Sequence, residues 1–158
     1  MLQETIQEFL KAGKVKEVEF AKLFNNVVAS SKEQDMKEHW DLQVGFKVDV
    51  KGLKKVKRSD SEVNENIHWL EIRNVNGTNG WLYSEETDLF AFETNNYWIV
   101  VEKSALQALV KERVQKVLVE SPELYKLYRR KGRKDLMTLV TSLDLCYICA
   151  SMLKKDES

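Results

Sequence analysis

Two aspartates and a lysine, Asp41, Asp49 and Lys51, stand close together in the sequence. Apolar and polar residues alternate over residues 46–51, which predicts a β-strand whose residues i and i+2 share one face. Asp49 and Lys51 are therefore expected to point the same way. A tight turn at Gly45 would pair this strand with the preceding one, so that the two carboxylates and the ammonium converge.

Such a group of side chains is suited to holding a divalent cation beside a phosphate. Adjacent carboxylates repel each other unless a cation lies between them, and Mg²⁺ is usually held by one or two carboxylates together with substrate phosphate. We expect Asp41 and Asp49 to bind Mg²⁺ or Mn²⁺, with the Val50 carbonyl as a further ligand and Lys51 beside the reacting phosphate. The same Asp-x-Lys tripeptide also fits a solvated strand edge, and that interpretation stays open.

Further polar residues can assist this group. Glu17 and Glu19 lie in a predicted helix, from which one of them can supply a third carboxylate. His39 shares a strand face with Asp41 and is a possible auxiliary residue.

A competing interpretation shifts the site along the chain. It takes Asp49 as the first aspartate and Glu71-Ile72-Arg73 as the second motif. Arg73 is a poor substitute for a lysine because its guanidinium stays protonated. Glu71 could otherwise act as an auxiliary acid beside the main site.

Two basic segments are candidate phosphate contacts. The chain has 25 basic and 25 acidic residues, so its net charge is zero and nucleic-acid binding would depend on local clusters. The first segment directly follows Lys51 and contains Lys54, Lys55, Lys57 and Arg58. The second is the densest in the chain and contains Arg129, Arg130, Lys131, Arg133 and Lys134. Both segments are expected to bind a phosphate backbone. Such contacts fix the position of the protein on the nucleic acid but do not distinguish one base sequence from another.

The hydrophobic pattern predicts a single α/β domain over residues 1–158. The expected helices are residues 2–12, a second one ending near residue 29, one starting at Ser104 and buried as far as residue 118, and a last one ending at residue 153. A polar connector of about one turn is expected at residues 32–38. Besides the two strands around Gly45, strands are expected at residues 67–75, 89–93, 97–101 and 136–140, with a hairpin turn at Asn95-Asn96.

The sequence shows no sign of a membrane-spanning segment, a signal peptide or a zinc site. No apolar run approaches the ~20 residues of a membrane span, and the N-terminus has neither the basic nor the apolar region of a signal peptide. Cys146 and Cys149 form a single C-x-x-C within an apolar pattern, which favours packing in a helix over a zinc or redox site. We expect a cytoplasmic protein without membrane contact.

The motif Asp41…Asp49-Val50-Lys51 resembles that of the PD-(D/E)xK nuclease superfamily, which includes restriction enzymes and Holliday-junction resolvases. The runs Trp69-Leu70-Glu71, Gly80-Trp81-Leu82-Tyr83 and Arg133-Lys134-Asp135 are similar to small phage proteins assigned to this fold. The chain departs from the pattern in two places. Asp49 stands where glutamate is commoner, and Trp40 replaces the proline before Asp41.

The resemblance implies a restriction-endonuclease-like core, a mixed sheet with a central antiparallel meander of strands near residues 40, 50 and 70, flanked by helices. It implies a Mg²⁺-dependent endodeoxyribonuclease, acting on DNA that includes branched or junction forms, in the host-cell cytoplasm if a phage encodes it. The superfamily often adds a glutamate from its first helix, for which Glu19 is the best match and Glu17 the second. A homodimer would present two sites for cutting two strands. The alternative function is a non-catalytic binding module on the same fold that engages a host protein or nucleic acid.

Overall fold

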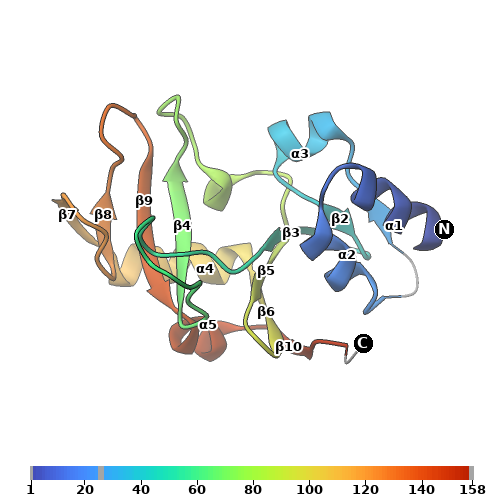
Figure 1. The fold of residues 1–158 in the computed structure, drawn as a ribbon. Coiled ribbons are helices and arrows are strands. Elements are labelled where there is room, and N and C mark those ends of the chain that lie inside the picture. The colour runs from blue at the N-terminus through green and yellow to red at the C-terminus, as the bar shows by residue number, and fades with distance from the viewer. Residues whose placement is uncertain (1, 25–26, 157–158) are drawn as a thin grey trace.

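The computed structural model of the protein describes residues 2–24 and 27–156. These residues form a mixed α/β protein with five α-helices, one short 3-10 helix and two mixed β-sheets (Figure 1). The helices are α1 (Leu2–Lys11), α2 (Val15–Ala21), α3 (Lys32–Glu38), η1 (Trp81–Tyr83), α4 (Lys103–Arg113) and α5 (Ser142–Ile148). Within the described ranges, no helix combines the length and the apolar character needed to cross a membrane.

The larger sheet carries the Asp-x-Lys strand near its middle. Its six strands follow the order β1 (Val28–Ala29), β2 (Leu42–Gln43), β3 (Lys47–Lys51), β5 (Leu89–Glu93), β6 (Tyr97–Glu102) and β10 (Ser151–Lys154). Strands β2 and β3 pair antiparallel around the turn at Gly45, whose φ of 92° favours glycine. On its other side β3 pairs parallel with β5, which continues through a hairpin into β6.

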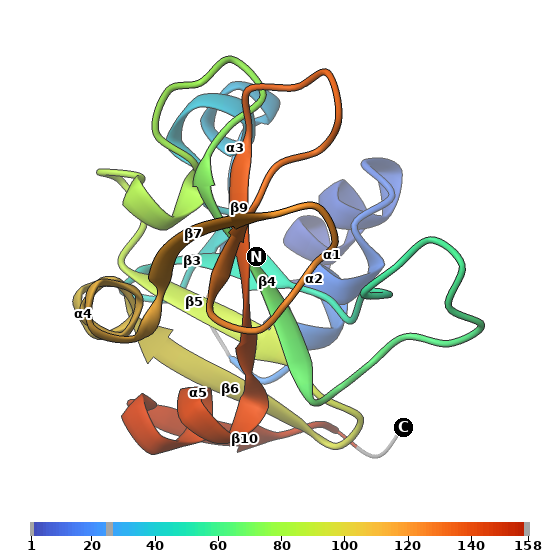
Figure 2. The ribbon, with the colours of Figure 1, turned by 90° about the vertical axis from the view of Figure 1, so that its left-hand side faces the viewer.

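The smaller sheet lies at the opposite end of the molecule from α1 and α2 (Figure 1). Its order is β4 (Ile67–Arg73), β9 (Leu136–Thr141), β8 (Lys126–Tyr128) and β7 (Gln115–Val119). Figure 2 shows β4 and β9 running across the direction of β5 and β6, with the loop before β4 standing out on one side. The two sheets therefore meet at an angle and leave a hollow between them, described below.

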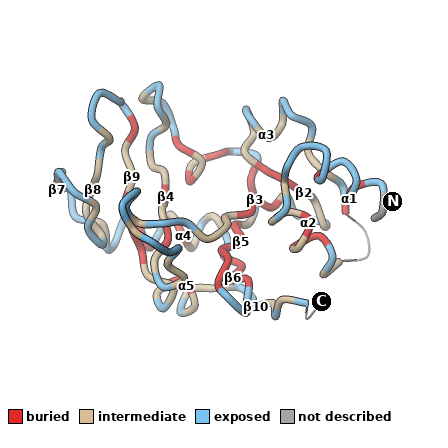
Figure 3. The backbone as a smooth tube through the Cα atoms, in the orientation of Figure 1, coloured by how far each residue is buried: buried red, intermediate tan, exposed pale blue. Residues whose placement is uncertain are grey.

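The centre of the larger sheet is buried on both faces (Figure 3). On one face, Trp98 packs edge-on against Phe20 of α2, with ring centres 5.2 Å apart. On the other face, Phe90 and Phe92 pack with Leu70 of β4 and with residues of α4 and α5. Burial on both faces explains why β5 and β6 are almost continuously apolar.

Three helix boundaries differ from the prediction. The second helix ends at Ala21 instead of near residue 29, where β1 stands, and residues 25–26 lie outside the described part. Helix α4 ends at Arg113, and the valine-rich continuation forms β7, in which Val117 and Leu118 are exposed rather than buried. The last helix ends at Ile148, and β10 replaces its expected second half. In the first two cases β-branched residues had been assigned to a helix, although they prefer extended backbone.

The expected three-stranded meander near residues 40, 50 and 70 is also wrong. The first two strands pair as β2 and β3, but β4 belongs to the other sheet and pairs with β9. The place beside β3 is taken by β5, whose residues are apolar on both faces, whereas β4 carries Trp69 and Glu71 toward the hollow. Phe46, an apolar residue of the segment predicted as a strand, is 59% exposed because it lies in the turn before β3 begins.

Candidate functional site

Asp41 is held at the junction of three strands. Its backbone N–H donates to the Val48 carbonyl at 2.8 Å, and its carbonyl accepts from the Ser30 N–H at 2.9 Å. Its buried carboxylate accepts a hydrogen bond from the Val50 N–H at 2.7 Å and faces the Lys14 ammonium at 3.0 Å. The Asp41 carboxylate is therefore fixed over β3.

Asp49 and Lys51 lie together on one face of β3. Asp49 is only 5% exposed, and its Oδ2 atom lies 2.7 Å from Lys51 Nζ, in an ion pair that lacks the alignment of a hydrogen bond. Lys51 Nζ also lies 4.0 Å from the centre of the Trp81 ring, a cation–π contact. The ammonium thus sits between a buried acid and an aromatic face.

The electrostatics indicate that the two aspartates are neighbours. Burial raises the pKa of Asp49 to about 7, the Lys51 charge opposes this rise, and the Asp41 charge adds to it. Two like charges repel each other more strongly in a protein interior than in water, because the effective dielectric constant is lower there. The structure thus brings Asp49 and Lys51 into contact and places Asp41 where its charge acts on Asp49.

The third carboxylate near this group is that of Glu17. Burial raises the pKa of Glu17, and the charge of Asp41 raises it further. Glu19, two residues along α2, instead forms an ion pair with Lys16 at 3.5 Å. Because residues two apart on a helix point in very different directions, only one of them can face Asp41. The effect of the Asp41 charge on the pKa of Glu17 makes this residue, the second choice from sequence, the better candidate.

Replacing Glu17 by glutamine should therefore weaken divalent-cation binding by about tenfold or more, whereas Glu19→Gln should leave it nearly unchanged. The two variants remove the same charge from the same helix, so each controls for the other. Isothermal titration with Mn²⁺ would measure both. Equal Mn²⁺ affinities of the two variants would show that Glu17 is not a ligand of the ion.

The acids present are suitable ligands for Mg²⁺ or Mn²⁺. Among the described residues, no group of three or more His, Cys, Asp or Glu side chains is arranged so that it could hold a metal ion. Asp49 Oδ2 is nevertheless buried without a hydrogen bond, and it lies beside a second carboxylate. Hard oxygen donors of this kind suit Mg²⁺. Asp41 and Asp49 are therefore the candidate ligands, and Glu17 and the Val50 carbonyl are the groups that would have to complete the site.

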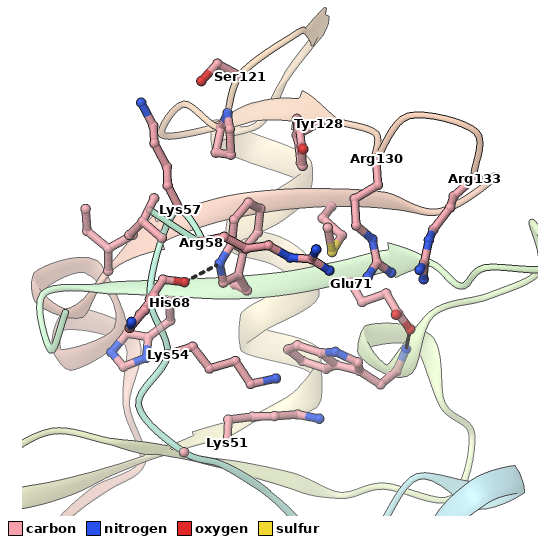
Figure 4. Close-up of a pocket in the computed structure, with 18 of the residues that line it drawn as sticks. Lys51, Lys54, Lys57, Arg58, His68, Glu71, Ser121, Tyr128, Arg130 and Arg133 are labelled. Atoms are coloured by element: carbon pink, nitrogen blue, oxygen red, sulfur yellow. Dashed lines mark hydrogen bonds between the residues drawn. The ribbon is translucent and has the colours of Figure 1, made fainter. Parts of the chain in front are cut away.

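Lys51 also lines a cleft of about 910 Å³ between the two sheets, the basic cleft (Figure 4). Its eight cationic residues are Lys51, Lys54, Lys55, Lys57, Arg58, Arg130, Lys131 and Arg133, against two acids, Glu71 and Glu120. In the described part of the chain only Lys51 and Arg130 have an ion-pair partner, the latter being Asp135. The cleft therefore carries an excess of positive charge that an anion would neutralise.

The environment of Lys54 reflects this excess. Burial lowers its pKa, and the Lys51 charge lowers it further. In Figure 4 the two ammonium groups lie side by side, below Arg130 and Arg133 of the loop between β8 and β9. Cations gathered in this way disfavour one another unless a phosphate or another anion joins them.

The remaining candidates lie outside the cleft. Arg129 is exposed, and Lys134 lies against Gly77 beside a separate shallow hollow. His39 caps the C-terminus of α3 with a left-handed backbone, φ 58°, and Arg73 is exposed at the end of β4. Glu71 does line the cleft, where its side chain accepts from the Trp81 N–H at 3.3 Å.

Sequence reasoning missed two partners of the site. Lys14, which holds Asp41, also forms an ion pair with Asp35 at 2.7 Å. Trp81 reaches Lys51 because Gly80 packs so closely on β4 that a Cβ there would lie 2.4 Å from the Glu71 carbonyl oxygen. The Gly80-Trp81 pair was the available signal, whereas nothing local marks Lys14.

No protein-family model, curated protein or solved structure matches this chain. The assignment of a function therefore depends on the geometry of these side chains and on the cleft beside them.

Proposed function

We propose that the protein is a metal-dependent endonuclease that hydrolyses phosphodiester bonds of DNA. The observation that carries the proposal is that Lys51 belongs both to the group of buried acids and to the lining of the basic cleft. Its ammonium pairs with buried Asp49, next to Asp41, and at the same time lines the basic cleft. Asp41 and Asp49 are buried and do not line the cleft themselves, so a phosphate drawn in by the cations would meet Lys51, whose ammonium contacts Asp49.

Each group has a distinct role in this proposal. Cations of the basic cleft bind the phosphates on either side of the scissile bond. Lys51 neutralises charge that develops on the reacting phosphoryl oxygens. Asp41, Asp49 and Glu17 would hold Mg²⁺, which when bound lowers the pKa of a coordinated water and polarises the phosphate. In the hydrolysis a bond would form from a water oxygen to phosphorus as the bond from phosphorus to the leaving oxygen breaks, with the proton of the water passing to solvent and the leaving oxygen taking one up from solvent.

A cleavage panel tests the proposal. Linear, branched and single-stranded DNA would be incubated with the protein and Mg²⁺ or Mn²⁺, with Asp49→Asn as the inactive control. Wild-type protein should cut at least one substrate, and Asp49→Asn should cut none. Equal nicking by both proteins would point to a contaminating nuclease and contradict the proposal.

One observation favours the second candidate, a non-catalytic binding module. Ion pairs with Lys14 and Lys51 already neutralise Asp41 and Asp49. Thermal unfolding with added Mn²⁺ separates the two candidates. A nuclease should be stabilised by about 2.7 kcal/mol when the ion is at 100 times its dissociation constant. A binding module should show no such shift.

DNA binding should depend on the cations inside the cleft more than on those outside it. We expect the double variant Lys54→Gln/Arg133→Gln to flatten the plot of log affinity against log salt by about 0.9 per lost phosphate contact. The matched control, Arg129→Gln/Lys134→Gln, removes the same charge from positions outside the cleft and should keep the wild-type slope. An unchanged slope for the first variant would mean that the cleft cations are merely solvated.

A further inference from the structure

One wall of the basic cleft is aromatic. Trp69 of β4 and Tyr128 of β8 both line it, with ring centres 5.8 Å apart and an interplanar angle of 43°. Both residues are partly exposed. They form a wall on the smaller sheet, and Figure 4 shows Tyr128 on the opposite side of the cleft from Lys51.

This aromatic wall is tied to the basic segment that faces it. The Trp69 indole N–H donates to the Lys55 carbonyl at 3.3 Å, which links the Lys54–Arg58 stretch to β4. Arg130 follows Tyr128 by two residues and also lines the cleft. The two aromatic side chains of this wall and eight cationic residues therefore line one cavity.

Double-stranded DNA would not use such a wall. Its bases are stacked inside the helix, and it presents phosphates and groove edges to a protein. A cleft of about 910 Å³ has the size of a pocket that encloses a small organic ligand rather than a helix. Proteins that hold single strands combine a cationic groove with aromatic rings on which unpaired bases stack.

We infer that the basic cleft binds a single-stranded segment of nucleic acid, with an unpaired base stacked on Trp69 beside Tyr128 and an adjacent phosphate at Lys51. The inference rests on the proposed function only in that the bound strand is also the one cut. Single-stranded DNA and single-stranded RNA share the stacking chemistry, and the experiment distinguishes them.

The first measurement uses the wild-type protein. Fluorescence anisotropy in EDTA would follow binding of labelled oligothymidylate, its RNA counterpart, a blunt duplex and an abasic deoxyribose-phosphate strand of equal length. The abasic strand keeps the phosphates and lacks the bases. We expect the DNA or RNA single strand to bind about 5- to 150-fold more tightly than the abasic strand, the effect of one stacked base.

The second measurement assigns that difference to the wall. Trp69→Leu should lower the affinity for the single strand toward that for the abasic strand, and Trp69→Phe should restore most of it. Tyr147→Leu is the matched control, because Tyr147 is 92% exposed on α5 and does not line the cleft. It should bind as the wild type does.

The outcomes separate this inference from the proposed function. Tighter binding of duplex than of single strand, or equal binding of the abasic strand, would overturn the inference, even if the protein cleaves duplex DNA. Preference for single strands that Trp69→Leu abolishes would uphold it, even if no strand is cut and the nuclease proposal fails.

Discussion

Replacing Lys51 by alanine should slow DNA cleavage by about 10²–10⁴-fold, the usual cost of losing one group that stabilises charge or transfers a proton in the transition state. The protein should still fold and bind Mn²⁺, because Asp41 is held independently by Val50 and Lys14. Single-turnover kinetics would measure the rate, and circular dichroism would check the fold.

Two further variants make this test specific. Lys51→Arg should recover only part of the activity, since the guanidinium is bulkier and always charged, and it must fit between Asp49 and Trp81. Glu71→Ala should retain activity if the site is built on β3. A normal rate for Lys51→Ala together with an inactive Glu71→Ala would move the active site to Glu71 of β4.

Asp49 should make the folded protein less stable as the pH rises. Its folded-state pKa is raised from 3.8 to about 7, so the folded state holds a proton that the unfolded chain has already released. Stability from this group is fully present below pH 3.8 and is lost as the pH rises through about 7. The linked change in unfolding free energy is up to about 4 kcal/mol.

Comparison with Asp49→Asn isolates this effect from other titrating groups. Urea unfolding would measure the free energy of unfolding of both proteins at pH 5 and pH 8. Relative to the wild type, the variant should be more stable at pH 8 than at pH 5, because asparagine carries no charge to bury. Saturating Mn²⁺ should restore wild-type stability at pH 8 and leave the variant unaffected. A difference between the two proteins that is independent of pH would mean that Asp49 titrates normally.

The pairing of Asp49 with Lys51 was predictable because it depends on local geometry. Alternate residues of a strand share a face wherever the strand is placed, and the turn at Gly45 gives β2 and β3 their antiparallel pairing. The hairpin of β5 and β6 was predictable for the same reason, since adjacent apolar runs around Asn95-Asn96 pair with each other.

Other features depended on contacts between distant segments. Nothing local distinguishes Glu17 from Glu19, because the choice is made by how α2 packs beside Asp41. The neighbour of β3 was likewise decided by which strand could be buried on both faces, and β5 satisfies that condition where β4 does not.

By itself, the sequence determined the chemistry available to this protein: two acids and a lysine on neighbouring strands, and two basic segments. The tertiary structure alone decided that cations from both segments line one cleft with Lys51 and that Trp69 and Tyr128 form its wall. The reason is that periodicity specifies the face on which a side chain lies, whereas the angle between two sheets depends on the packing of β4 against β5, β6 and α4.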